Sequence, residues 1–178
     1  GPVLKDDNKA YALRFVGMND VNHSTAWLKM NKSKNIDEWL DALRMEQLAS
    51  LNLVYADKDD NIFFVHNAKS PVRDPNYNWK QVVPGNKSEL IWTDFHPFES
   101  VPQILNPSSG YIFSTNQNPF FVTAKEDNLS LSNFNPTMGF QTRTTNRAYR
   151  AYELLDADKS ISFSELDKYK HDNKFSYN

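Results

Sequence analysis

The apolar residues of this chain lie in short runs that polar loops separate, and this pattern constrains the fold more than any other feature of the sequence. No run approaches the roughly 20 residues that a membrane-spanning helix requires. The intervening loops are rich in Asn, Asp and Ser. A core must therefore come from several short elements packed together, and 178 residues suffice for one domain built in this way.

Composition and charge exclude several classes of protein. Aromatic residues make up 13% of the chain, which argues against disorder because disordered segments carry few large apolar groups. A net charge of −2 provides no basic field to attract nucleic acid or acidic lipid. The chain contains no cysteine, which excludes a disulfide scaffold, a thiolate zinc site and a cysteine nucleophile.

The clearest helical pattern covers residues 35–48. Asn35 is a favourable N-cap, and Glu38 follows in the first turn, where the helix dipole favours an anion. The apolar residues of this segment recur at the spacing of one helical face. They are Ile36, Trp39, Leu40, Leu43 and Leu48.

Two more helices are predicted toward the C-terminus. Residues 148–155 place Ala148, Ala151, Tyr152 and Leu155 on one helical face. The Ser-x-x-Glu pattern of residues 162–165 is a capping box that opens a short helix toward Lys170.

Short β-prone runs complete the pattern. Residues 51–56 and 62–65 flank an Asp- and Asn-rich turn, which predicts a hairpin. Residues 67–88 carry several prolines and little apolar periodicity, which predicts a long loop of the kind that is usually functional or mobile. The mixture of hairpins and helices without βαβ alternation predicts an α+β fold. Further short strands are expected at 11–16, 90–92 and 111–115.

Common catalytic and metal motifs are absent. The four histidines are isolated from one another, and no zinc-protease helix motif, nucleophile elbow or phosphate-binding glycine loop occurs. The segment Asp156–Glu165 resembles an EF-hand calcium loop, but Glu165 is its tenth position rather than its twelfth, and the central glycine is missing. A capped helix start after an acidic turn explains this segment better.

The segment Gly110–Pro119 offers the most promising chemistry. A predicted strand runs directly into polar amides and stops at a proline. An asparagine at such a strand end can direct its side-chain N–H at the negative charge that develops on an oxygen during acyl transfer. Asn-rich stops are more commonly plain turns, and Arg147 on its helix is by default a solvated surface residue. The residues alone leave both interpretations open.

Four blocks, taken in order, resemble the β-chain of the penicillin amidase (penicillin acylase) family. They are GPV (1–3) with YALR (11–14), LVYAD (53–57) with NI (61–62), PSSG through NP (107–119), and NR through LL (146–155). The stretches at 128–129, 134–139 and 142–147 are closest to the aculeacin A acylase and acyl-homoserine-lactone acylase branch. The resemblance covers nearly the whole chain, and the order and spacing of the blocks make it specific.

This resemblance implies an N-terminal-nucleophile hydrolase with a four-layer αββα sandwich. Members of that superfamily are made as an inactive precursor that cuts itself and exposes a serine at the N-terminus of the β-chain. That serine attacks an amide carbonyl, with its own α-amino group as general base, and water hydrolyses the resulting acyl-enzyme. A free α-amine titrates near pH 8, so it can act as a base near neutral pH.

The resemblance also assigns roles to individual residues. Asn116 matches the oxyanion-hole asparagine, and Gln117 replaces the second amide of the family's Asn-Asn-x-Pro pattern. Arg147 matches an arginine that helps to hold the catalytic amine and the oxyanion donor. Asp127 falls where some members place a calcium ligand. No cofactor is required by this chemistry, and structural calcium is the one metal that the resemblance suggests.

The chain begins with Gly1 rather than with serine, so we expect residues 1–178 to be a single β-chain fragment that lacks the nucleophile and is inactive alone. Its expected partners are an N-acyl amide substrate and the remaining α- and β-chain segments, with no nucleic acid or membrane partner. The substrate would be an acyl-homoserine lactone, a lipopeptide or a penicillin-type side chain. Family resemblance suggests a periplasmic or secreted location. The alternative is a non-catalytic calcium-binding or scaffold module centred on Asp156–Glu165.

Overall fold

The computed structural model describes residues 3–6, 8–48, 50–67 and 69–177, and these form two compact units. The first unit contains Gly1–Leu51, Asn67–Val101 and Phe134–Phe140, and the second contains Asn52–His66, Pro102–Asn133 and Gln141–Asn178. Gly1 and Pro2, on which the expectation of a missing nucleophile rests, lie outside the described residues.

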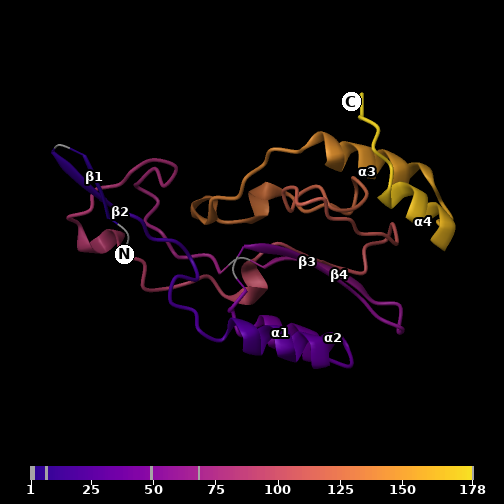
Figure 1. Cartoon of the computed structure of the whole chain (residues 1–178), viewed down its shortest axis with the longest axis horizontal. Helices are drawn as coiled ribbons and strands as arrows, with labels where there is room; N and C mark the ends of the chain where they lie inside the picture. The colour runs from indigo at the N-terminus through magenta and orange to yellow at the C-terminus, as the bar shows by residue number, and fades with distance from the viewer. Residues whose placement is uncertain (1–2, 7, 49, 68, 178) are drawn as a thin grey trace. The chain divides into compact units, whose positions relative to one another are not determined.

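The first unit combines a small hairpin with a pair of helices. Strands β1 (Val3–Asp6) and β2 (Lys9–Ala12) pair antiparallel, and helices α1 (His23–Lys32) and α2 (Ile36–Leu43) pack side by side (Figure 1). The strand predicted at 11–16 therefore ends early. After Ala12 the chain leaves the hairpin, and Leu13 and Phe15 remain exposed. Short 3₁₀ turns follow at Ser88–Leu90, Phe98–Ser100 and Pro136–Met138.

Helix α2 confirms the predicted start but ends before the predicted limit. The Asn35 side chain accepts a hydrogen bond from the Glu38 backbone N–H at 2.9 Å, as an N-cap does. The helix stops at Leu43, and Glu46 then adopts a positive φ of 52°, which no helix can continue through. Leu48 is nevertheless only 1% exposed. The apolar spacing of Leu48 therefore indicated a buried side chain and not a helical residue.

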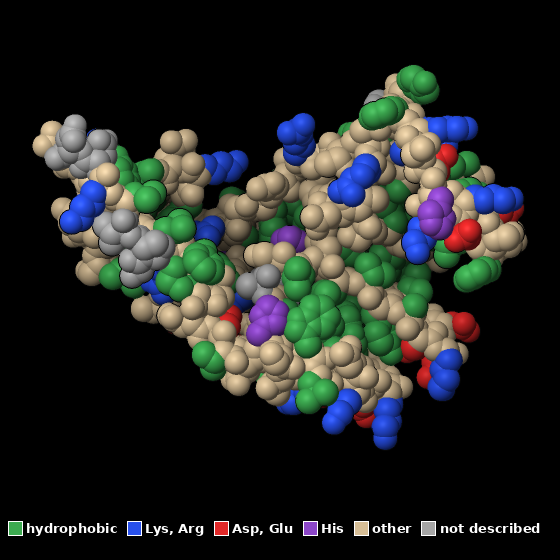
Figure 2. Space-filling view, in the orientation of Figure 1, with side chains coloured by type: hydrophobic (Ala, Val, Ile, Leu, Met, Phe, Trp, Pro, Cys, Tyr) green, Lys and Arg blue, Asp and Glu red, His purple; other side chains and the backbone are tan. Residues whose placement is uncertain are grey.

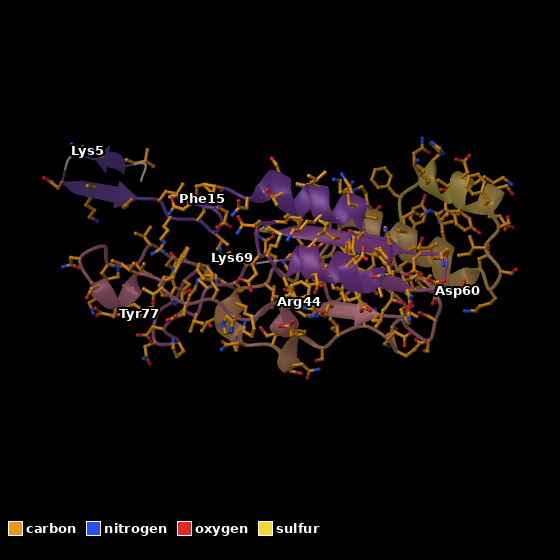
Figure 3. The ribbon with its side chains drawn as sticks, turned by 90° about the horizontal axis from the view of Figure 1, so that it is seen from below. Lys5, Phe15, Arg44, Asp60, Lys69 and Tyr77 are labelled. Atoms are coloured by element: carbon orange, nitrogen blue, oxygen red, sulfur yellow. The ribbon has the colours of Figure 1, made fainter. Side chains whose placement is uncertain are left out.

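The second unit is built on a three-stranded sheet. Strands β3 (Leu51–Ala56) and β4 (Ile62–Asn67) form the predicted hairpin, and β5 (Gln103–Leu105) pairs antiparallel with β4, with Phe63 opposite Leu105. Asp60 lies in the turn between β3 and β4 (Figure 3). Phe64 is fully buried with Ile104 and Val122, and Ile112 and Leu129 pack against this cluster.

Helices α3 (Asn146–Ala157) and α4 (Phe163–Lys170) complete the second unit and confirm the two C-terminal helices (Figure 1). The capping box is also confirmed, because the Ser162 side chain accepts from the Glu165 backbone and the Glu165 carboxylate accepts from the Ser162 backbone. Acidic and basic side chains are interspersed on the surface over α4 (Figure 2). No helix within the described ranges is long and apolar enough to span a bilayer.

Two predicted strands are wrong. Leu90 is the last residue of a 3₁₀ turn, and neither Ile91 and Trp92 nor residues 111–115 have strand conformation. The Tyr111 carbonyl accepts from the Thr123 hydroxyl at 2.7 Å, where a strand would receive a backbone N–H. Phe113 does donate its N–H to the Val122 carbonyl at 2.9 Å, so the two segments touch without forming a ladder. The long loop is confirmed, because no helix or strand occurs at 69–87.

We expect Phe64→Ala to lower the free energy of unfolding by about 3–5 kcal/mol, since it removes a fully buried aromatic ring and leaves a cavity. Urea unfolding measures this change. Val54→Ala on β3 is the control, because Val54 is 50% exposed and its truncation should cost less than about 0.5 kcal/mol. Equal losses in the two variants would contradict the assignment of this core.

Candidate functional site

Asn116 occupies an unusual backbone conformation at the centre of the segment Phe113–Phe121, which we call the site loop. Its φ is +68°, in the left-handed region that costs an L-residue roughly 1–2 kcal/mol and that asparagine tolerates better than most. The side chain is exposed, and it makes no hydrogen bond to the described part of the chain. A polar side chain held out from a strained backbone position is a functional candidate.

The side chain of Gln117 folds the site loop around this position. Its carbonyl oxygen accepts from the Thr115 N–H at 2.5 Å, and its NH₂ donates to the carbonyls of Phe113 at 3.3 Å and Phe121 at 2.7 Å. Gln117 is only 5% exposed, so this buried amide has partners for both its donor and acceptor groups. Gln117, which replaces the second asparagine of the pattern that the sequence resembles, thus closes the site loop with its side chain.

Asn118 connects the site loop to the segment that leads into α3. Its NH₂ donates to the Thr142 carbonyl at 3.1 Å and to the Thr144 hydroxyl at 3.0 Å. Helix α3 then begins after its N-cap Thr145, whose side chain accepts from the Ala148 N–H. The segment that leads into α3 is therefore tied to the site loop.

Arg147 lies in the first turn of α3 and contacts the site loop directly. Its guanidinium donates to the Thr115 carbonyl at 2.8 Å, which is the peptide group immediately preceding Asn116. The structure thus brings together the two residues that the sequence singled out, Asn116 and Arg147, although they are 31 positions apart. Arg147 is exposed, as the default interpretation of a solvated surface residue expects, and it also holds this loop carbonyl.

A cluster of aromatic rings packs α3 against the site loop. Phe121 lies 5.0 Å from Tyr152 and 5.5 Å from Tyr149, centroid to centroid, and 5.8 Å from Phe113 in an edge-to-face arrangement. The Tyr111 hydroxyl also donates to the Asp156 carboxylate at 3.2 Å. These contacts fix the helix that carries Arg147 against the loop that carries Asn116.

This geometry suits the stabilisation of a developing negative charge. The Asn116 side chain presents an uncommitted N–H donor, while other side chains hold the Thr115 N–H, the Thr115 carbonyl and the Phe121 carbonyl. The Arg147 cation lies one peptide group away. Donors that are held in place before the reaction need no reorganisation when charge appears, which is the principle of an oxyanion hole.

Asp127 lies elsewhere in the second unit, and its carboxylate already has partners. One oxygen accepts from the Ser108 hydroxyl at 2.8 Å and the other from the Ser109 N–H at 2.7 Å. Calcium takes six to eight oxygen ligands, and no group of three or more His, Cys, Asp or Glu residues gathers anywhere in the described ranges. The residues described here therefore do not by themselves fit a calcium ion, and the metal role of Asp127 stays a prediction.

The acidic segment before α4 forms local contacts. Asp158 accepts from the Ser160 N–H at 2.9 Å and from the Tyr169 hydroxyl at 2.7 Å, while Asp156 accepts from Tyr111. Glu165 completes the capping box. Each carboxylate points to its own partner, which confirms the interpretation of a capped helix start after an acidic turn.

The sequence did not indicate that Asn52 and His66 belong to the site region. Asn52 on β3 donates its NH₂ to the Gln117 carbonyl at 2.9 Å, and its oxygen faces His66 Nδ1 on β4 at 2.7 Å. Burial lowers the pKa of His66 below its ordinary value, which favours the neutral ring. The sequence offered no signal for this contact beyond an isolated histidine and an asparagine 65 positions before Gln117.

Comparison with known proteins gives consistent results. The sequence model of the penicillin amidase family matches residues 1–178. The chain is 36% identical over 100 residues to penicillin G acylase of Escherichia coli, covering 56% of this chain and 12% of that protein. It is 30% identical over 120 residues to the penicillin acylase 2 proenzyme of Pseudomonas sp. (strain SE83), covering 65% of this chain and 15% of that protein.

A solved structure extends the likeness to the fold. The thermostable penicillin G acylase from Alcaligenes faecalis superimposes on 95% of this chain with a TM-score of 0.74 and 25% identity, and the match covers 29% of that chain. The chain thus spans less than a third of the length of each of these relatives. The mixed helix and strand content that the sequence predicts agrees with this structural match.

We expect the free energy of unfolding to fall as the pH drops below about 6.5, partly because of His66. The unfolded histidine titrates near pH 6.5, whereas the folded one has a lowered pKa, so the unfolded state binds the proton first. Urea unfolding of wild type and His66→Asn between about pH 5 and pH 8 measures this contribution. In His66→Asn, the free energy of unfolding should fall less steeply with falling pH than in wild type. His171→Asn, at an exposed position, should keep the wild-type contribution of His66. Identical slopes for wild type and His66→Asn would contradict the prediction.

Proposed function

We propose, because the chain belongs to the penicillin amidase family, that it is part of an enzyme that hydrolyses linear amides through an acyl-enzyme intermediate. The observation that supports this proposal most directly is the strained, exposed Asn116, whose preceding carbonyl is held by Arg147. The proposal assigns the oxyanion donor to Asn116. It assigns to Arg147 the role of keeping that donor in place.

The chemistry follows from the charge that an attacked amide develops. When a serine oxygen adds to the carbonyl carbon, the carbonyl oxygen becomes an alkoxide, and the Asn116 N–H can donate to it. Collapse of this intermediate expels the amine and leaves an ester, which water then cleaves at the same position. Both steps pass through an oxyanion, so one well-placed donor serves both.

Arg147 contributes a positive charge as well as a hydrogen bond. A guanidinium group carries its positive charge throughout the pH range in which proteins work. Because it donates to the carbonyl that precedes Asn116, it restrains the loop and places a cation near the proposed oxyanion. A lysine could restore the charge but has no planar fork to reach the same carbonyl with the same geometry.

The nucleophile in this proposal is a serine exposed by self-cleavage of a precursor, and it comes from a segment outside the 178 residues. The remaining α- and β-chain segments are then the partners of this chain, and the chain alone has no acylase activity. The substrate is an N-acyl amide with a long acyl chain, such as an acyl-homoserine lactone or a lipopeptide, or a penicillin-type side chain. We place the enzyme in the periplasm or outside the cell on the basis of the family resemblance.

We expect Asn116→Ala, made in the full-length protein, to lower kcat for a chromogenic N-acyl amide by about 10²–10³-fold, the usual cost of one oxyanion donor. Asn106→Ala is a matched control, because Asn106 is also an exposed asparagine with a positive φ, of 47°. It should keep wild-type turnover. Wild-type turnover in Asn116→Ala, with the fold retained by circular dichroism, would remove Asn116 from the site.

We expect Arg147→Met to lower kcat by roughly 10–100-fold, which is the usual cost of losing a hydrogen bond to a charged group. The reason is that the Thr115 carbonyl loses its donor. Steady-state kinetics of the full-length protein measure this effect. Arg150→Met on the same helix is the control, since Arg150 pairs with Asp172 instead of the site loop. A loss of similar size in both variants would point to damage of α3 and not to a role at the site.

A further inference from the structure

We propose that Asn52, held in one orientation by His66, is a positioning residue that fixes the Asn116 amide for catalysis. This inference rests on the proposed function and adds two residues to it. Neither residue approaches the reacting atoms through its own side chain. They act on the backbone of the site loop, at the peptide group that follows Gln117, one residue beyond Asn116.

The hydrogen-bond partners determine the orientation of the Asn52 amide. The Gln117 carbonyl can only accept, so the Asn52 NH₂ must face it at 2.9 Å. The Asn52 oxygen then faces His66 Nδ1 at 2.7 Å, and that nitrogen must carry the proton. The result is a directed series of two hydrogen bonds, from the His66 N–H to the Asn52 oxygen and from the Asn52 NH₂ to the Gln117 carbonyl. If His66 could not donate, the Asn52 oxygen would lose its donor, and the Gln117 carbonyl alone would favour this orientation.

Two strands of the sheet carry the residues of this hydrogen-bond series. Asn52 and His66 lie on β3 and β4, neighbouring strands of the sheet that carries the buried Phe64 cluster. His66 itself is half-buried. The site loop is irregular and has no strand ladder of its own, so its position depends on such side-chain contacts.

The contacts around Asn116 leave its backbone little freedom. On one side, Arg147 holds the Thr115 carbonyl, and the Gln117 side chain holds the Thr115 N–H. On the other side, Asn52 holds the Gln117 carbonyl. The left-handed residue thus lies between two held peptide groups, the one that directly precedes it and the one that follows Gln117. Removal of the Asn52 contact releases one of these two anchors.

The expected effect is a loss of kcat with little change in KM. Misplacement of a catalytic group by about 1 Å can cost about 10²-fold in rate, whereas substrate affinity depends on other contacts. We therefore expect Asn52→Leu in the full-length protein to lower kcat for a chromogenic N-acyl amide by about 10–100-fold. Leucine has a similar size and shape but cannot donate to the Gln117 carbonyl.

Two His66 variants separate positioning from simple packing. His66→Asn places an NH₂ close to the position of Nδ1 and can still donate to the Asn52 oxygen, so it should keep kcat near the wild-type value. His66→Leu fills the space without a donor and should lose kcat as Asn52→Leu does. Asn61→Leu is the matched control on the same hairpin, because the Asn61 side chain bonds to Asp57 and Asn106 and should leave kcat unchanged.

The outcomes distinguish this inference from the proposed function. Wild-type kcat in Asn52→Leu, together with an inactive Asn116→Ala, overturns the positioning role and leaves the proposed function standing. Wild-type kcat in Asn116→Ala overturns both. Should Asn52→Leu fail to fold, the His66 pair decides the question, since equal kcat values in His66→Leu and His66→Asn overturn the role and rescue by asparagine alone supports it.

Discussion

The candidate site depends on one constraint, which is that Asn116 must be kept in a left-handed backbone conformation. That conformation costs roughly 1–2 kcal/mol, while a single hydrogen bond contributes a net stabilisation of only about 0.5–1.5 kcal/mol. One contact would leave the loop free to relax. Gln117, Arg147 and Asn52 together supply several contacts to the backbone around Asn116, and these contacts oppose that relaxation.

The local parts of the fold could be predicted from the sequence, whereas the non-local parts could not. The Asn35 cap and the Ser162 capping box depend on residues three positions apart, and both are confirmed. The strand predicted at 111–115 failed because a strand exists only where a partner offers a ladder, and there the Thr123 hydroxyl takes the place of a partner N–H. Likewise, Leu48 had the right spacing for α2 but is buried beyond the end of the helix.

The candidate site shows the same division. The resemblance to known β-chains pointed to Asn116 and Arg147, and the structure adds the contact that joins them through the Thr115 carbonyl. The sequence predicted neither the burial of Gln117 nor the reach of Asn52 across 65 positions, since both depend on how the sheet meets the site loop. Side-chain hydrogen bonds to distant backbone groups follow no periodicity, so no sequence pattern predicts them.

Asn106 and Asn116 show why backbone conformation alone does not identify a site. Both are exposed asparagines with positive φ. The Asn106 side chain is committed, because it accepts from the Ile62 N–H at 2.8 Å and donates to the Asn61 side chain at 3.1 Å. The Asn116 side chain makes no such bond to the residues that the structure describes, while its neighbours are satisfied. Asn106 therefore closes a turn with its amide, whereas the amide of Asn116 has no partner among the described residues, as the proposed role of oxyanion donor requires.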